Sequence, residues 1–176
     1  MILGVVLAGG QSTRFGSDKA LAELSGHTLL NRAYDALTGF CELVVVAGRA
    51  QGPGHCIPDW PHDNMGPLGG IAAGLRLARD ENYESVLTCG VDSVQLPENL
   101  LELLSPAPAF VESQPVIGHW PTGAVDAIET LLLSEAKHSM LAFAGAVGAT
   151  AVKIAADPAN INTPADLTAA EKNYGI

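Results

Sequence analysis

The chain has 176 residues, a formal net charge of −10 and a hydrophobic content of 48%. This length is typical of one globular domain, and we expect a single domain over residues 1–176. Proteins that bind nucleic acid present a basic face, and no apolar run here approaches the ~20 residues that a membrane-spanning helix needs. We therefore expect neither nucleic acid nor a membrane as a partner.

The three cysteines, Cys41, Cys56 and Cys89, form no CxxC pair. An odd number of isolated thiols is typical of a reducing compartment, and it fits neither a disulfide framework nor a zinc site. The chain starts with a strand-like run rather than with a basic segment followed by an apolar one, so no secretion signal is expected. The sequence therefore predicts a cytoplasmic protein.

Apolar runs alternate with helical patterns along the chain, which is typical of βαβ units around a mostly parallel sheet. Buried strands are predicted at 2–7, 43–47, 85–89 and 151–154. Helices are predicted at 29–37, 68–77, 100–104, 126–133 and 139–147. Pro97 is expected to open the third helix, Thr163 to cap a further C-terminal helix, and residues 48–65 to be irregular. The expected fold class is α/β, with one doubly wound, Rossmann-like domain.

A glycine-rich segment follows the first predicted strand, reading VVLAGGQSTRFGSDKALA at 5–22. Gly9 and Gly10 remove two Cβ atoms where the backbone leaves the sheet, so main-chain N–H groups can approach a polyanion closely. Arg14 offers a planar fork for phosphate oxygens, and Lys19 offers a compact charge. The spacing matches neither a Walker A loop nor a GxGxxG fingerprint. We interpret the segment as a phosphate-binding loop; the alternative is an ordinary turn with solvated charges.

A carboxylate, Asp92, follows the third predicted strand. Ligands of open α/β sheets bind outside the carboxyl ends of the strands, so the strand ends at 7–10, 47–49 and 89–92 are expected to meet. Asp92 would then lie beside the glycine loop as a hard oxygen ligand for Mg²⁺, which takes one or two carboxylates together with substrate phosphates. A solvated aspartate that caps a turn is the alternative.

The segment LAGGQSTRFGSDKA at 7–20 resembles the LAGGxSxRxGxDKA signature of the nucleotidyltransferases that act on sugar phosphates and on molybdopterin. Two later segments, GPLGGIAAGL at 66–75 and NINTPADL at 160–167, narrow the resemblance to the molybdenum cofactor guanylyltransferases. The resemblance covers essentially the whole chain, with weak stretches at 105–116 and 134–152. It implies the nucleotide-diphospho-sugar transferase fold. It also implies transfer of GMP from GTP to molybdopterin, with release of pyrophosphate.

The same resemblance implies roles for individual residues. Lys19, Arg14 and Asp92 would be catalytic, with Asp92 as the Mg²⁺ ligand, Lys19 on the α-phosphoryl group and Arg14 on the leaving pyrophosphate. Asp59 would contact the nucleotide, because a carboxylate can accept from both N1–H and N2–H₂ of guanine, although Asp63 could take this part instead. The implied nucleotide-binding residues are Leu7, Ala8, Gly9, Gly10, Lys19, Asp59 and Asp92.

Two stretches depart from the pattern of the family. The usual CDxP reads Val91-Asp92-Ser93-Val94 here, and the asparagine that similar guanylyltransferases place after the second strand is missing from the run VAGR at 46–49. A related enzyme that uses CTP or a sugar phosphate, or a nucleotide-binding homologue without catalysis, therefore remains an alternative.

Molybdoenzyme-maturation proteins are expected as further partners. Trp120 would either stack on the pterin or pack in the core.

Overall fold

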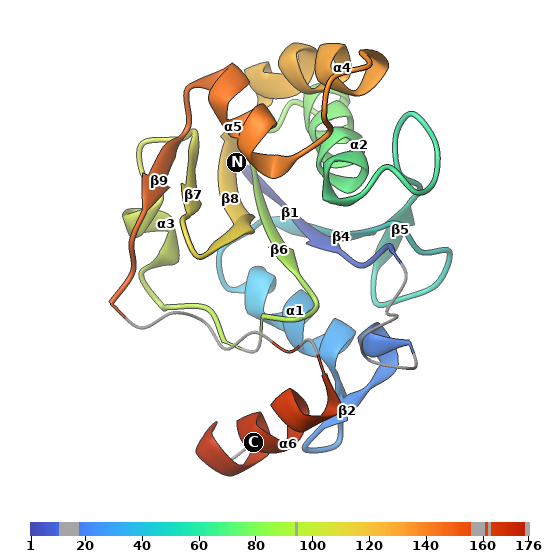
Figure 1. Ribbon diagram of the computed structural model, residues 1–176, viewed down its shortest axis with the longest axis vertical. Coiled ribbons are helices and arrows are strands. Elements are labelled where there is room, and N and C mark those ends of the chain that lie inside the picture. The colour runs from blue at the N-terminus through green and yellow to red at the C-terminus, as the bar shows by residue number, and fades with distance from the viewer. Residues whose placement is uncertain (11–17, 94, 156–160, 162, 175–176) are drawn as a thin grey trace.

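A seven-stranded sheet forms the centre of the molecule (Figure 1), in a computed structural model that describes residues 1–10, 18–93, 95–155, 161 and 163–174. Its strands stand in the order β5-β4-β1-β6-β8-β7-β9. They are β1 (Ile2–Leu7), β4 (Leu43–Ala47), β5 (His55–Ile57), β6 (Ser85–Gly90), β7 (Ala109–Val111), β8 (Gln114–Pro121) and β9 (Thr150–Val152). β1 pairs in parallel with β4 and β6, whereas β8 runs antiparallel to both of its neighbours, so the sheet is mostly parallel.

Helices cover both faces of this sheet (Figure 1). One face carries α1 (Leu29–Thr38) and α3 (Leu100–Leu103), and the other carries α2 (Pro67–Asp80), α4 (Val125–Leu133) and α5 (Met140–Val147). The short elements η1 (Lys19–Leu21), β2 (Glu23–Leu24) and β3 (His27–Thr28) precede α1, and η2 (Thr122–Ala124) precedes α4. The last helix, α6 (Pro164–Tyr174), lies at the end of the molecule near β2. The predicted α/β, Rossmann-like class is confirmed.

The central strands are mostly apolar and deeply buried because both of their faces are covered. Every residue of β6 is buried, as are the four central residues of β1. On one side, α1 contributes a single buried stripe, Leu29, Leu30, Ala33 and Leu37, as the helical period requires. On the other side, a Cβ on Gly74 would lie 2.5 Å from Cγ2 of Val5. The glycines of α2 therefore let that helix approach β1 closely.

The sequence prediction was wrong in four places. β7 and β8 form a hairpin over residues 109–121 that the sequence did not indicate, and β5 lies inside the stretch that was expected to be irregular. Pro97 does not open α3, which starts at Leu100 after an Asn99 cap; Pro97 instead accepts a hydrogen bond from the N–H of Leu100. β9 ends at Val152 rather than at 154. β5, β7 and β9 have three residues each, so their pairing partners rather than their own patterns determine where they form.

Trp120 packs in the core and does not reach a ligand. The side chain is fully buried, stacks on Phe110 and lies against Phe143, while its indole N–H donates to Oγ1 of Thr88 at 3.1 Å. The pterin-stacking interpretation is therefore wrong.

The predicted cap of the C-terminal helix is confirmed. Thr163 accepts from the N–H of Asp166, and the Asp166 carboxylate accepts from the N–H of Thr163. All three cysteines are free thiols. Over the described part of the chain, no helix combines the length and the apolar character needed to cross a membrane.

Candidate active site

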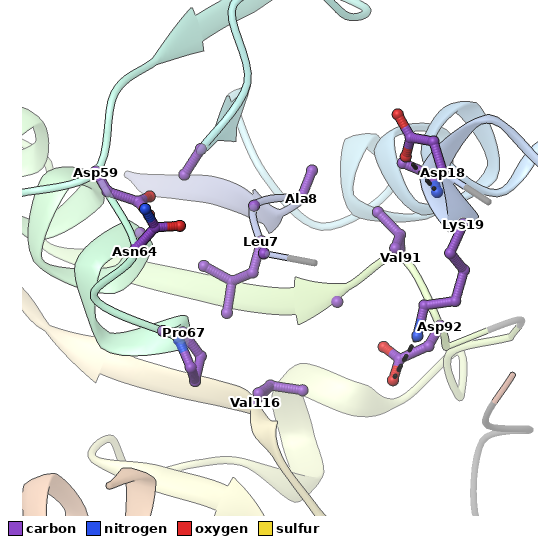
Figure 2. Close-up of a pocket in the computed structure, with 17 residues that line it drawn as sticks. Leu7, Ala8, Asp18, Lys19, Asp59, Asn64, Pro67, Val91, Asp92 and Val116 are labelled. Carbon is purple, nitrogen blue, oxygen red and sulfur yellow. Dashed lines mark hydrogen bonds and ion pairs between the residues drawn. The ribbon is translucent and has the colours of Figure 1, made fainter. Parts of the chain in front are cut away.

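A pocket of about 320 Å³ opens at the carboxyl ends of the parallel strands (Figure 2). Leu7 at the end of β1 is in register with Ala47 of β4 and Gly90 of β6, so the three loops that follow these strands meet at one edge of the sheet. From β1 the chain continues to β4 and β5 on one side of β1, and α2 then returns it to β6 on the other side, so the strand order reverses between β1 and β6. The pocket therefore lies at the switch point where such folds bind ligands.

The pocket has two chemically different ends. In Figure 2, Asp59 and Asn64 lie at one end, Lys19 and Asp92 lie at the other, and Leu7 lies between them. The residues that line it are Leu7, Ala8, Gly9, Gly10, Asp18, Lys19, Ala20, Ala47, Asp59, Asn64, Gly66, Pro67, Gly70, Gly90, Val91, Asp92 and Val116.

Glycines surround the Asp59 carboxylate. A Cβ on Gly9 would lie 3.5 Å from Oδ2 of Asp59, one on Gly48 would lie 3.2 Å from Oδ1, and one on Gly69 would lie 3.1 Å from the Asp59 Cβ. Because these three positions carry no side chain, they leave a notch around the Asp59 carboxylate. Burial, and secondarily the negative charge of Asp63, raise the pKa of the Asp59 carboxyl above its usual value. A half-buried carboxylate of this kind is stabilised by a ligand that offers hydrogen-bond donors.

Gly48 and Gly9 allow the loops after β4 and β1 to touch. A Cβ on Gly48 would lie 2.7 Å from the Cα of Gly9 and 2.8 Å from its N, and Gly48 has a φ of +86°, in the left-handed region. A side chain at this position is therefore excluded unless the two loops move apart. This close contact brings the glycine loop to the notch that holds Asp59.

A cation and a carboxylate face each other at the other end. Nζ of Lys19 lies 3.8 Å from Oδ2 of Asp92, and their side chains are 16% and 24% exposed. Lys19 starts the η1 turn, and Asp92 follows β6 by two residues, so the pair joins the glycine loop to the end of the third parallel strand. At this separation, oxygen atoms of a phosphate chain can contact the cation while the carboxylate stays available to a metal ion.

The turn that carries Lys19 is held by an ion pair. Asp18 caps η1 by accepting from the N–H of Ala20 at 3.2 Å, and its two oxygens accept from Arg49 at 3.0 and 2.8 Å. The hydrogen bonds from Arg49, which follows β4, lower the pKa of the Asp18 carboxyl. Arg49 therefore fixes the position of the segment that presents Lys19, although it does not line the pocket itself.

Buried contacts support the loop that carries Asp92. Oγ of Ser93 donates to Oε1 of Gln114 at 2.9 Å. Both residues are buried, and Gln114 is the first residue of β8. The carbonyl oxygen of Asp92 accepts from the N–H of Ile161 at 2.7 Å, and the Ile161 side chain is buried in the core. This loop lacks the proline expected from the family pattern, and these two contacts constrain it instead.

The helix α2 directs its N-terminus at the pocket. Gly66 and Pro67 line the cavity, with Pro67 in the first turn of the helix. The backbone of Gly66 adopts φ 68° and ψ −163°, a conformation open to glycine and strained for other residues. The partial positive charge of a helix N-terminus favours anionic groups in the pocket.

The structure brings together most of the residues that the sequence singled out. Leu7, Ala8, Gly9, Gly10, Lys19, Asp59 and Asp92 all line this one pocket. Arg14 and the start of the segment at 160–167 lie outside the described residues. Asp63 does not line the pocket, which favours Asp59 over it.

Sequence reasoning missed two residues of the site. Asn64 lines the pocket, and Arg49 supports the turn of Lys19. A signal was present for Asn64, since an asparagine just before the GPLGG segment is suited to a left-handed turn. Nothing in the sequence indicated that Arg49 pairs with Asp18, because 31 residues separate them.

The sequence model of the MobA-like NTP transferase domain matches residues 4–152. The chain belongs to this family of nucleotidyltransferases. A protein named molybdenum cofactor guanylyltransferase from Acidiphilium cryptum is 37% identical over 95% of this chain and 92% of its own length. A protein of the same name from Rhodobacter capsulatus is 36% identical over 97% and 95%. The family membership and enzyme class predicted from the sequence are thereby confirmed.

The fold is also found in a solved structure. Molybdopterin-guanine dinucleotide biosynthesis protein A from Archaeoglobus fulgidus superposes with a TM-score of 0.74, at 20% identity, over 98% of each chain. At this identity the likeness concerns the fold alone.

Proposed function

We propose that this chain is a molybdenum cofactor guanylyltransferase, which transfers GMP from GTP to molybdopterin. The main support is the pocket with two different ends, with the glycine-lined Asp59 carboxylate at one end and Lys19 and Asp92 at the other. One end suits a base that offers two donors, and the other suits a phosphate chain. The names of the relatives at 36–37% identity agree with guanine as the base.

In the proposed reaction, a terminal phosphate oxygen of molybdopterin attacks the α-phosphorus of GTP in line. The new P–O bond forms as the bond to the bridging oxygen of the β-phosphate breaks, and pyrophosphate leaves. No protein nucleophile is required, so the protein acts by alignment and by stabilising charge. Lys19 stabilises the charge on the α-phosphoryl group, and the backbone from Leu7 to Gly10 holds the phosphate chain. Arg14, by the family pattern, holds the pyrophosphate.

Asp92 is the residue that would hold Mg²⁺. Its carboxylate lies at the phosphate end of the pocket and provides a hard oxygen ligand of the type that this ion prefers. When bound, Mg²⁺ supplies neutralisation of charge on the phosphate oxygens. The buried contacts of Ser93 and Ile161 keep the Asp92 loop in place for this role.

The proposal is tested first by binding and then by turnover. We expect GTP with Mg²⁺ to raise the melting temperature more than CTP, ATP or UTP, because a ligand at about a hundred times its Kd adds roughly 2.7 kcal/mol. Pyrophosphate release should then require both GTP and molybdopterin. A preference for CTP would assign the chain to a cytidylyltransferase. Binding of GTP without pyrophosphate release would indicate a homologue without catalysis.

Lys19→Ala should lower turnover by about 100- to 1000-fold, the cost typical of losing a group that stabilises transition-state charge. The melting temperature should change little, because the ammonium group lies at the pocket surface. Lys153→Ala is the matched control, since Lys153 is 85% exposed and lies 3.9 Å from Glu112 at the surface. Unimpaired turnover in Lys19→Ala would exclude the assigned role.

We also place the reaction in the cytoplasm and expect transfer of the product to molybdoenzyme-maturation proteins. The three free thiols support the reducing compartment. The net charge of −10 suits partners that present basic patches. Co-purification with such a partner should weaken as salt concentration rises, because salt screens attraction between exposed charges.

A further inference from the structure

Guanine presents acceptors as well as donors, and Asp59 can satisfy only the donors. Its carboxylate accepts from N1–H and N2–H₂, which leaves the acceptor edge, O6 and N7, in need of a donor. Among the described residues that line the pocket, two carry side-chain donors, Lys19 and Asn64. Lys19 lies at the opposite end from Asp59, beside Asp92 (Figure 2). Asn64 is thus the side-chain donor at the end where a base would sit.

The backbone around Asn64 suits this role. Asn64 has a φ of +63° in the loop between β5 and α2, a left-handed conformation that asparagine tolerates better than most residues. In the loop after β4, position 48 cannot carry a donor, because a Cβ on Gly48 would meet the Cα of Gly9 at 2.7 Å. The Arg49 guanidinium donates to Asp18 instead of lining the pocket. The donor therefore comes from the loop that precedes α2, not from the loop that follows the second parallel strand.

We propose that the side-chain amide of Asn64 donates to the acceptor edge of guanine while Asp59 accepts from its donor edge. This inference rests on the proposed function. Adenine would place its N1 lone pair against the Asp59 carboxylate, and cytosine its N3 lone pair, so Asp59 would have no donor to accept from with either base. Asp59 thus selects against both bases, because the mismatch leaves its carboxylate unpaired. Asn64, whose amide can present either NH₂ or oxygen, adds affinity for the acceptor edge of guanine.

The test compares Asn64→Gly with Asn82→Gly. Glycine removes the amide and keeps the left-handed backbone without strain. Asn82 has almost the same φ, +62°, and is exposed beyond the end of α2, so it controls for the substitution itself. Dissociation constants are measured for GTP, 6-thio-GTP and 7-deaza-GTP, of which the analogues weaken or remove the acceptor at position 6 or 7. Both variants are checked for an unchanged melting temperature.

Asn64→Gly should weaken GTP binding by about 3- to 10-fold, the loss expected for one hydrogen bond to a neutral group. The loss should shrink or vanish with at least one of the two analogues, because the deleted donor then has no acceptor to miss. Asn64→Asp should weaken GTP binding further, since a carboxylate would face the guanine acceptors. Asn82→Gly should bind all three nucleotides as the unaltered protein does.

An unchanged GTP affinity in Asn64→Gly, or an equal loss with GTP and both analogues, would overturn the assignment of Asn64. If the unaltered protein still prefers GTP over CTP and ATP in the melting-temperature comparison, the proposed function stands without the role of Asn64. If the unaltered protein shows no preference for GTP, the proposed function fails, and the role of Asn64 fails with it.

Discussion

The ion pair between Asp18 and Arg49 joins the loop after β4 to the turn that carries Lys19, so breaking it should reduce turnover more than stability. The variants are Asp18→Asn, Arg49→Gln, Arg49→Lys and the double variant of the first two. Asparagine keeps an oxygen that can accept from the N–H of Ala20, so Asp18→Asn removes the ion pair and spares the cap of η1.

The expected loss of stability is small. Two hydrogen bonds of 3.0 and 2.8 Å join the side chains, but Asp18 is 45% exposed and Arg49 is 20% exposed, so solvent screens the pair. Pairs of this kind contribute up to about 1 kcal/mol, which corresponds to a shift in melting temperature of roughly 2–4 °C for a chain of this size. Arg49→Lys keeps the charge and loses the fork, so it should fall between the unaltered protein and Arg49→Gln.

The expected loss of turnover is larger. A displacement of a catalytic group by about 1 Å can cost on the order of 100-fold in rate, and Lys19 follows Asp18 directly. We therefore expect kcat for pyrophosphate release to fall by about 10- to 100-fold, with a smaller change in KM for GTP. The double variant should be no worse than Arg49→Gln alone, because the two residues act as one unit.

The stabilisation that the Asp18–Arg49 pair contributes should not depend on pH near neutrality. The pKa of Asp18 is lowered by the hydrogen bonds from Arg49 and stays below the ordinary value of about 3.9. The stabilisation is therefore complete above the unfolded pKa and is lost only as the pH falls through the folded value, below about pH 4. Additive losses in the double variant, or unchanged kcat in both single variants, would refute the coupling of this pair to Lys19.

Two further predictions concern the loops around the pocket. Gly48→Ala should lower the melting temperature and weaken GTP binding, because the new Cβ would meet Gly9 at 2.7 Å and the left-handed φ would add about 1–2 kcal/mol of strain; calorimetry of the free and GTP-bound protein checks both. Ser93→Ala should destabilise by about 1–2 kcal/mol by removing the buried hydrogen bond to Gln114, and it should lower kcat, whereas Ser105→Ala at an exposed position should do neither. Equal denaturation midpoints for the two serine variants would contradict this account of the Asp92 loop.

The sequence was sufficient to predict the elements whose local pattern and burial agree. β1, β4 and β6 are mostly apolar because both of their faces are buried, and α1 and α2 carry buried stripes at helical spacing. The hairpin of β7 and β8 escaped prediction because its burial depends on distant partners. One edge of β8 pairs with β6, and Trp120 in β8 is buried between Phe110 and Phe143.

The sequence by itself determined which residues form most of the site, and the tertiary structure determined how those residues are arranged. The glycine loop, Lys19 and Asp92 could be selected from their residue types and from their places after apolar runs, because parallel strands end at a common edge. The sequence could not predict the pairing of Asp18 with Arg49 or the place of Asn64 at the base end. Each depends on how far two loops approach each other, and that distance is set by glycine contacts such as Gly48 on Gly9, which form only when the sheet is assembled.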